Sequence, residues 1–141
     1  MGVVIGTGVD LVHVPGFADQ VQRPGTWVDR VFTPGERRDA RSFLADASAS
    51  RAAEVASLAA RWAAKEAFVK AWSESLWGRA PVLGEEIHHL IEVVTDAWGR
   101  PRLVLHGEVR AALGEDIAAF VSLSHDGDYA IATVTLTRPP S

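Results

Sequence analysis

One long segment in the middle of the chain constrains its fold more than any other feature. Ser48 or Ser50 can cap a helix and Gly78 can end it, so we expect a helix that runs to about Trp77. At about 100° per residue, one face of this helix is apolar. That face consists of Val55, Leu58, Trp62, Val69, Trp72 and Leu76. Much of another face is alanine, which lets a second element approach closely, so the segment is typical of a core helix.

The segment before this helix predicts a strand, a loop and a shorter helix. The apolar run over 3–10 predicts a strand, and Pro15, Pro24 and Gly25 mark the stretch that follows as loop-rich. The sequence Thr33-Pro34-Gly35-Glu36 has the pattern of a capping box, with proline at the first helical position. We therefore expect a helix from there to about Leu44.

The part of the chain after the long helix alternates β-branched runs with turn signals. The elements expected there are strands over 87–94, 103–105, 117–123 and 129–136, a turn over 96–101 and a helix over 108–113 closed by Gly114. Asp126-Gly127 is a strong hairpin signal between the last two strands. Because strands and helices do not alternate strictly, the order favours an α+β fold over a doubly wound sheet, in a single domain over 1–141.

The composition excludes several classes of protein. With 48% hydrophobic residues among 141, the chain can bury a core without cross-links, and it is not a disordered tail. It has no cysteine, which excludes a disulfide framework, a cysteine nucleophile and a cysteine-ligated zinc site. The net charge of −4 is not a nucleic-acid footprint. No long apolar run could span a membrane and no basic region precedes the first one, so we expect a cytoplasmic protein.

The two lysines of the chain lie close together on the long helix. Lys65 falls near the centre of the apolar stripe, where a charge is costly unless it is paired. Glu66 lies at the boundary between the apolar and alanine faces, and Lys70 follows it by one turn on the same side. Glu66 and Lys70 have the spacing of a surface ion pair. A charged pair beside a tryptophan-lined face can also hold a metal and a phosphate, and the spacing alone leaves both interpretations open.

Asp10, at the end of the first predicted strand, is another candidate. It follows a run in which Gly6 and Gly8 allow close approach by a ligand or by another backbone. An aspartate at a strand end is also typical of a turn or a cap. Gly6-Thr7-Gly8 is not a dinucleotide-binding fingerprint, because neither a third glycine nor a helix follows it.

Two segments that contain histidine have to be interpreted as well. Ser124, His125 and Asp126 are adjacent, which does not make a catalytic triad, and the period of a strand points Ser124 and His125 to opposite faces. A polar hairpin tip is the alternative interpretation of this group. His88 and His89 are neighbours on a predicted strand and cannot both ligate one metal, so we interpret them as structural or exposed.

Five motifs occur together in this chain. They are Gly8-Val9-Asp10-Leu11-Val12, Phe32-Thr33-Pro34-Gly35-Glu36, Arg61-Trp62-Ala63-Ala64-Lys65-Glu66-Ala67 with Lys70, Gly99-Arg100-Pro101, and Ser122-Leu123-Ser124-His125-Asp126 with Tyr129-Ala130. The set covers roughly residues 3 to 136 and closely resembles the holo-acyl-carrier-protein synthases, the short-chain type of 4′-phosphopantetheinyl transferase. The motif around Lys65 and Glu66 is the most specific of the five.

The resemblance implies a fold and a reaction. The family has an α+β fold with one long helix packed on a small antiparallel sheet, and its members form homotrimers with active sites between protomers. It transfers the 4′-phosphopantetheine arm of coenzyme A to a serine of apo acyl carrier protein and releases adenosine 3′,5′-bisphosphate. This reaction requires magnesium and supports fatty acid biosynthesis.

The same resemblance implies a set of site residues. Asp10 and Glu66 would be the magnesium ligands, and with Lys70, which would face a phosphate, they would be the catalytic residues. The coenzyme A contacts would be Lys70, Ser124, His125 and, near the phosphates, Arg61 and Lys65. The chemistry agrees, because magnesium prefers one or two carboxylates together with substrate phosphates and water. Phosphoryl transfer depends chiefly on positioning and charge neutralisation.

Two alternatives to a transferase remain open at this point. A non-catalytic coenzyme A-binding oligomer would keep the fold without turnover, and a metal-dependent phosphohydrolase would act on coenzyme A alone. The chain also departs from the family in charge, since residues 16–30 carry two arginines against two aspartates. The basic face for the carrier protein is therefore weaker there, and the arginines at 37, 38 and 41 could serve instead. A carrier domain within a larger synthase is the alternative acceptor.

Overall fold

The computed structural model describes residues 2–41 and 47–141 of the chain. The helices are α1 (Val14–Gln22), α2 (Trp27–Val31), α3 (Pro34–Arg41), α4 (Ala47–Ser75), the 3-10 helix η1 (His88–Leu90) and α5 (Gly107–Leu113). The strands are β1 (Val3–His13), β2 (Ile91–Thr95), β3 (Pro101–Leu105), β4 (Ala118–Asp126) and β5 (Tyr129–Arg138). Among the described helices, none combines the length and the hydropathy that a membrane span requires.

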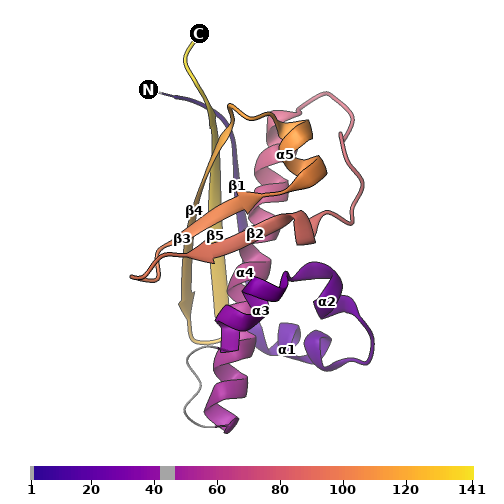
Figure 1. Ribbon diagram of the computed structural model, residues 1–141, viewed down its shortest axis with the longest axis vertical. Helices are drawn as coiled ribbons and strands as arrows, with labels where there is room; N and C mark the ends of the chain where they lie inside the picture. The colour runs from indigo at the N-terminus through magenta and orange to yellow at the C-terminus, as the bar shows by residue number, and fades with distance from the viewer. Residues whose placement is uncertain (1, 42–46) are drawn as a thin grey trace.

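Helix α4 runs through the middle of the molecule and packs along one face of an antiparallel sheet (Figure 1). The strand order in this sheet is β1-β5-β4, so the first and the last strands of the chain are neighbours. Every second residue of β5 is buried against α4: Ala130, Ala132, Val134 and Leu136. The predicted α+β fold, with one long helix on a small antiparallel sheet, is confirmed. Helix α4 ends at Ser75, two residues before the end predicted at Trp77. Gly78, in the turn after the helix, has a φ of +79°.

Two glycines of β1 allow the sheet to approach α4 backbone to backbone. A Cβ atom on Gly6 would lie 2.1 Å from the carbonyl oxygen of Ala71, and one on Gly8 would lie 2.0 Å from that of Ala67. Neither position has room for a side chain. The close approach predicted from the two glycines is therefore made to the backbone of α4 and not to a ligand.

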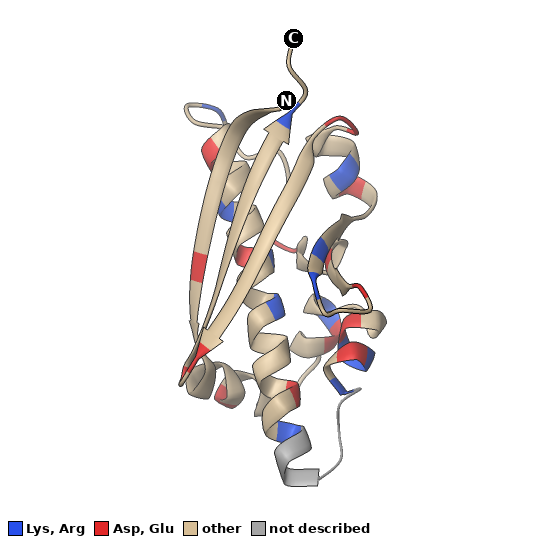
Figure 2. Ribbon diagram, turned by 90° about the vertical axis from the view of Figure 1, so that its left-hand side faces the viewer, with Lys and Arg blue, Asp and Glu red and all other residues tan. Residues whose placement is uncertain are grey.

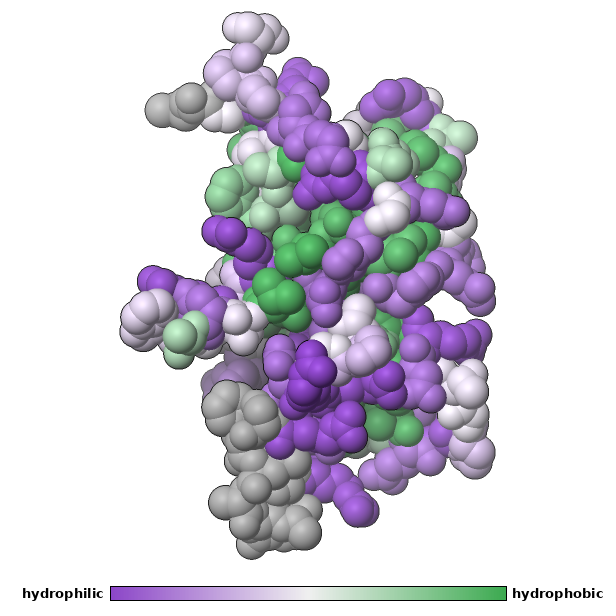
Figure 3. Space-filling view, viewed as in Figure 1, coloured by the Kyte–Doolittle hydropathy of each residue, from purple (hydrophilic) through white to green (hydrophobic). Residues whose placement is uncertain are grey.

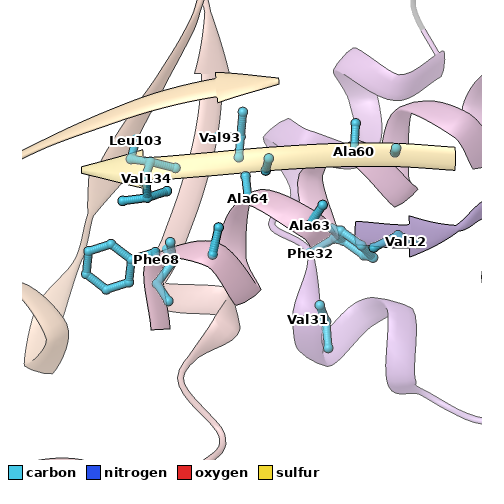
Figure 4. Packing of buried hydrophobic residues seen from close by; sticks show 14 of the residues in the cluster. Val12, Val31, Phe32, Ala60, Ala63, Ala64, Phe68, Val93, Leu103 and Val134 are labelled. Carbon is cyan, nitrogen blue, oxygen red and sulfur yellow. The ribbon is translucent and has the colours of Figure 1, made fainter. Parts of the chain in front are cut away.

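The core is shared by all layers of the fold. The two-stranded antiparallel sheet β2-β3 and the short helices α1 to α3 also pack on α4. Figure 4 shows the cluster: Ala60, Ala63, Ala64 and Phe68 of α4, Val12 of β1, Val134 of β5, Val93 and Leu103 of β2-β3, and Val31 and Phe32 at the end of α2. The alanines keep the helix thin, so strands and helices can surround it closely.

The capping box at the start of α3 is confirmed. The backbone N–H of Glu36 donates to Oγ1 of Thr33 at 3.1 Å, and the backbone N–H of Thr33 donates to Oε1 of Glu36 at 3.0 Å. Each side chain therefore satisfies a backbone donor that the helix leaves open. The predicted end of this helix at Leu44 lies outside the described residues.

Two predictions of local structure are wrong. The stretch after residue 10 was expected to be loop-rich, but it holds the end of β1 and helices α1 and α2. Pro15 lies in the first turn of α1, where its missing N–H costs no hydrogen bond. The predicted strand over 87–94 starts only at Ile91, and the three residues before it form η1. A buried lysine ammonium accounts for this turn, because it draws in the carbonyl groups of His88 and Ile91.

The face of the sheet that points away from α4 carries apolar side chains among threonines and serines, and it is uncovered in the single chain. The three strands are almost free of charged side chains (Figure 2). Val9, Leu11, Phe120 and Ile131 are exposed on this sheet by 51, 61, 61 and 38%. On the face that carries β2, β3 and α5, hydrophobic groups are instead interrupted by hydrophilic side chains (Figure 3).

Candidate active site

The junction of β1 and α4 brings together the three predicted catalytic residues. Asp10 lies on the same side of β1 as Gly8, because the two are separated by the strand period of two, and it therefore faces α4. Its Oδ1 accepts a hydrogen bond at 3.0 Å from Nζ of Lys70, which also donates to the carbonyl of Val9 at 3.0 Å. Glu66 lies one helical turn before Lys70 on α4.

A histidine holds the carboxylate of Glu66. His88 Nε2 lies 2.6 Å from Glu66 Oε1, and its ring packs on Trp62 with the two centroids 4.7 Å apart. Lys70 thus forms an ion pair with Asp10, and His88 forms a hydrogen bond with Glu66. The simple surface pair between Glu66 and Lys70, one of the two interpretations of their spacing, is not formed.

Asp10 and Glu66 are close enough to interact electrostatically. Burial raises the pKa of Asp10, the Lys70 ammonium lowers it, and the charge of Glu66 raises it further, so that the pKa ends above its ordinary value. Within the described part of the chain, no hydrogen bond uses Oδ2 of Asp10 or Oε2 of Glu66. Each carboxylate therefore has one oxygen bound to a nitrogen of the protein and one that remains free.

This pair of carboxylates fits magnesium better than zinc. No group of three or more histidine, aspartate or glutamate side chains converges among the residues that the structure describes. Zinc sites use three or four protein ligands. Magnesium is commonly held by one or two carboxylates, with water and substrate phosphates completing its shell. Asp10 and Glu66 match the second pattern.

A pocket of about 490 Å³ opens beside Glu66. Helix α4 forms one wall with Glu66, Val69 and Trp72, and the segment 79–88 that leads to η1 forms the other. His88 lines this pocket and also a second one of about 530 Å³ on the side of Trp62. Glu66 therefore lies beside a largely apolar groove, and His88 lies between the two pockets.

Lys65 is fully buried and paired, as its place in the apolar stripe requires. Its Nζ donates to Oε1 of Glu36 at 2.8 Å and to the carbonyl groups of His88 and Ile91 at 2.8 and 2.5 Å. Glu36 is also buried and accepts two further bonds from backbone N–H groups. Burial lowers the pKa of Lys65, an effect that the Glu36 carboxylate opposes. All three ammonium N–H bonds are used inside the core, so Lys65 does not face a ligand site.

Arg61 is also largely buried, with 7% of its surface exposed. Its Nη1 donates to the carbonyl and the hydroxyl of Ser57. Its Nε has no hydrogen-bond partner among the described residues. Burial lowers the pKa of Arg61, while the neighbouring carboxylates of Glu36 and Asp39 raise it. The structure therefore gives no support to a place for Arg61 or Lys65 beside the nucleotide phosphates.

Ser124 and His125 lie near the hairpin end of β4, and β5 separates them from Asp10 on β1. Ser124 pairs with Ile131, which faces outward, and His125 pairs with Ala130, which faces α4. The predicted opposite orientation of the two residues is confirmed. Both are exposed, and within one chain neither joins the charged groups at the β1–α4 junction.

Comparison with known families agrees with the geometry. The family model described as the 4′-phosphopantetheinyl transferase superfamily matches residues 6–134. The chain belongs to the 4′-phosphopantetheinyl transferase superfamily. This 4′-phosphopantetheinyl transferase is similar to the holo-[acyl-carrier-protein] synthase of Mycobacterium tuberculosis (strain ATCC 25618 / H37Rv). The two are 54% identical over 139 residues, which cover 99% of this chain and 100% of the relative. The resemblance inferred from the five motifs is confirmed.

Solved structures show the same likeness. An apo acyl carrier protein synthase of Chronobacterium ammoniagenes superimposes with a TM-score of 0.86 at 46% identity, covering 99% of this chain and 100% of that chain. Its complex with coenzyme A superimposes with a TM-score of 0.84 at 46% identity, covering 96% of this chain and 98% of that chain. The transferase fold is thus shared over nearly the whole length.

His88 is a residue of the candidate site that the sequence did not point to. The prediction treated it as one of two adjacent histidines on a strand. In η1 the strand geometry is absent, so His88 turns toward Glu66 while His89 is exposed. The one signal in the sequence was a histidine pair just before a β-branched run, and such a pair does not specify a partner on a distant helix.

Proposed function

We propose that this transferase moves the 4′-phosphopantetheine group of coenzyme A to a serine of apo acyl carrier protein and releases adenosine 3′,5′-bisphosphate, with magnesium. The observation that carries the proposal is the convergence of Asp10, Glu66 and Lys70, with an apolar pocket beside Glu66. The relative solved in complex with coenzyme A supports the identity of the donor. The names of the curated relatives support acyl carrier protein as the acceptor.

Asp10 and Glu66 would hold the magnesium ion through the oxygens that the protein leaves free. When bound, the ion would neutralise the charge of the coenzyme A pyrophosphate. Lys70 has a half-exposed side chain, so its ammonium can turn from Asp10 to a phosphate oxygen. There it would stabilise the charge that develops on the leaving phosphate. The nucleophilic serine would come from the carrier protein, so the enzyme needs chiefly to position the two substrates and to neutralise the charge of the phosphates.

The pocket beside Glu66 would take the pantetheine arm. Its walls are mostly apolar, with Val69 and Trp72 on α4 facing Val82 and Leu83. An arm in this groove would place its phosphate end near Glu66 and leave the rest sheltered from water. The serine could then approach from the open side.

The apolar outer face of the sheet supports a homotrimer with sites between protomers. Leu11 and Ile131 are paired across β1 and β5 and both point away from α4. Contiguous exposed apolar surface of this kind marks an interaction site. Ser124 lies on the same face as Ile131, and His125 follows it at the hairpin. In an assembly through this face, the two residues of one protomer would reach the nucleotide held by another, which is how we retain them as coenzyme A contacts.

The test is an intact-mass assay. The enzyme is incubated with coenzyme A, magnesium and a panel of apo carrier proteins, both free and embedded in larger synthases. Addition of one phosphopantetheine group to at least one carrier is expected, and no mass gain on any of them would refute the proposal. Glu66→Gln should keep the circular dichroism spectrum and lose turnover. Hydrolysis of coenzyme A without a carrier would favour the phosphohydrolase, and binding without turnover would favour the non-catalytic oligomer.

A carrier protein as acceptor would place the enzyme in fatty acid biosynthesis, in the cytoplasm. The panel assay also decides between a free carrier and a synthase domain, because the preferred acceptor shows the highest rate.

A further inference from the structure

We propose that His88 is a positioning residue of this transferase, which orients the carboxylate of Glu66 for metal binding. The inference rests on the proposed function, because it takes Glu66 as a metal ligand. It goes beyond that function because His88 would act through Glu66 without touching the substrate.

His88 is held at three points, all of them on α4. Its Nε2 lies 2.6 Å from Oε1 of Glu66, and its ring packs on Trp62 with an interplanar angle of 32°. Its carbonyl accepts a hydrogen bond at 2.8 Å from Nζ of Lys65. Since Lys65 is itself locked in the buried pair with Glu36, the backbone of residue 88 is anchored to the core. Both the backbone and the ring of His88 therefore have a defined place before any ligand arrives.

The hydrogen bond restrains one oxygen of Glu66 and leaves the other available. A carboxylate that binds a metal ion only accepts, so Nε2 of His88 would be the donor in this contact. Oε2 of Glu66 makes no hydrogen bond within the described chain. Lys70 does the same for Asp10, using Oδ1 and leaving Oδ2. The two carboxylates thus present one free oxygen each before a ligand binds, and of the two donors only His88 stays on its carboxylate when Lys70 turns to a phosphate.

Such outer partners matter for metal affinity. Groups that hydrogen-bond to a metal ligand fix its orientation, and their removal typically weakens metal binding or activity by about 10 to 100-fold. Without His88, the long side chain of Glu66 would rotate at the edge of the pocket and would have to be ordered on binding. The side chain of His88 is only 18% exposed, so solvent does not readily replace its hydrogen bond.

The experiment separates the hydrogen bond from the ring. His88→Gln keeps an N–H donor and removes the ring, whereas His88→Phe keeps the ring and removes the donor. His88→Leu lacks both and is the second donor-free variant if the phenylalanine variant does not fold. His89→Ala, at the exposed neighbouring histidine, is the matched control. Circular dichroism checks the fold of each variant.

The readout is binding of Mn²⁺, the probe ion, by the full chain with saturating coenzyme A, measured from the electron paramagnetic resonance signal of free Mn²⁺. We expect His88→Phe to bind Mn²⁺ at least about tenfold more weakly, and His88→Gln and His89→Ala to stay within about threefold of wild type. The apparent magnesium requirement of turnover should shift in the same order.

The outcomes are distinct. Wild-type affinity in folded His88→Phe or His88→Leu would overturn the inference, and so would a loss in His88→Gln equal to that in His88→Phe, because ring packing would then be the cause. If the variants rank as expected but no carrier protein is modified, the transferase proposal fails and the positioning role stands. A wild-type chain that binds no Mn²⁺ would overturn both.

Discussion

The backbone contact between β1 and α4 leads to a strong prediction for Gly8→Ala. The added Cβ would lie 2.0 Å from the carbonyl oxygen of Ala67 and 2.7 Å from the backbone nitrogen of Ala71. Both are backbone atoms of a helix, so no side chain can rotate away. Real Cβ contacts essentially never fall below 3.0 Å, and strand and helix must therefore separate by about 1 Å at this point.

The cost follows from what that separation disrupts. Overpacking a core costs about 1–3 kcal/mol, and more where the structure cannot yield. Ala67 and Ala71 are fully buried at this contact, so moving the strand away also loses their dispersion contacts. We expect Gly8→Ala to lower the free energy of unfolding by about 3 kcal/mol or more, a large part of the usual 5–15 kcal/mol. The shift would also move Asp10 away from Lys70, and turnover should fall with stability.

Urea denaturation followed by circular dichroism measures this loss, at one protein concentration for all variants. The matched control is Gly84→Ala, because a Cβ on Gly84 meets no atom within 4 Å and its φ is not in the left-handed region. It should change the free energy of unfolding by no more than about 0.5 kcal/mol. A loss below about 1 kcal/mol in Gly8→Ala, with normal turnover, would refute the reasoning from backbone contact.

Three further predictions concern the charged groups and the sheet. Burial raises the pKa of Asp10 in the folded protein above its ordinary value of 3.8. Protonated Asp10 therefore stabilises the fold fully below pH 3.8, and this stabilisation is lost as the pH rises through the pKa of the folded state. At pH 7 and without metal, Asp10→Asn should therefore melt at the same temperature as wild type or higher, and added magnesium should not stabilise it. Scanning fluorimetry measures both, and a melting temperature below that of metal-free wild type would contradict the raised pKa. Lys65→Met leaves Glu36 buried and unpaired, which should lower the free energy of unfolding by about 3–5 kcal/mol in urea denaturation. Adding Glu36→Gln should recover most of that free energy, and a loss under about 1 kcal/mol in Lys65→Met would argue against the buried pair. Ile131→Asp places a charge on the outer face of the sheet and should yield folded monomers in analytical ultracentrifugation. Trp98→Asp, in the exposed turn between β2 and β3, should not change the assembly, and identical sedimentation of both variants would refute the proposed interface.

Local patterns in the sequence predicted the elements that local physics determines. The capping box formed as expected, because both of its hydrogen bonds join Thr33 and Glu36, which lie within one stretch of four residues. The hairpin at Asp126-Gly127 formed, and Gly127 has the positive φ, +56°, that the tight turn needs. Helices α1 and α2 were missed because their short apolar faces pack on other elements, as Phe17 does on Phe32 and Trp27 on Trp62.

The candidate site was predicted in part. Resemblance to a family pointed to Asp10, Glu66 and Lys70, and the structure places them at one junction. Spacing on the helix could not show that Lys70 pairs with Asp10 instead of Glu66, since that choice depends on a strand about 60 residues away. For the same reason His88 could not be found as the partner of Glu66.

By itself, the sequence determined the class of fold, the central helix, and the need for Lys65 to find an opposite charge, because periodicity and the cost of burying a charge are readable along one dimension. Only the tertiary structure decided that Glu36 pairs with Lys65 and that the two carboxylates of the candidate site meet at the β1–α4 junction. It also decided that the glycines of β1 make room for the backbone of α4. Those contacts join segments far apart in the chain, and their energies depend on distances that no local pattern contains.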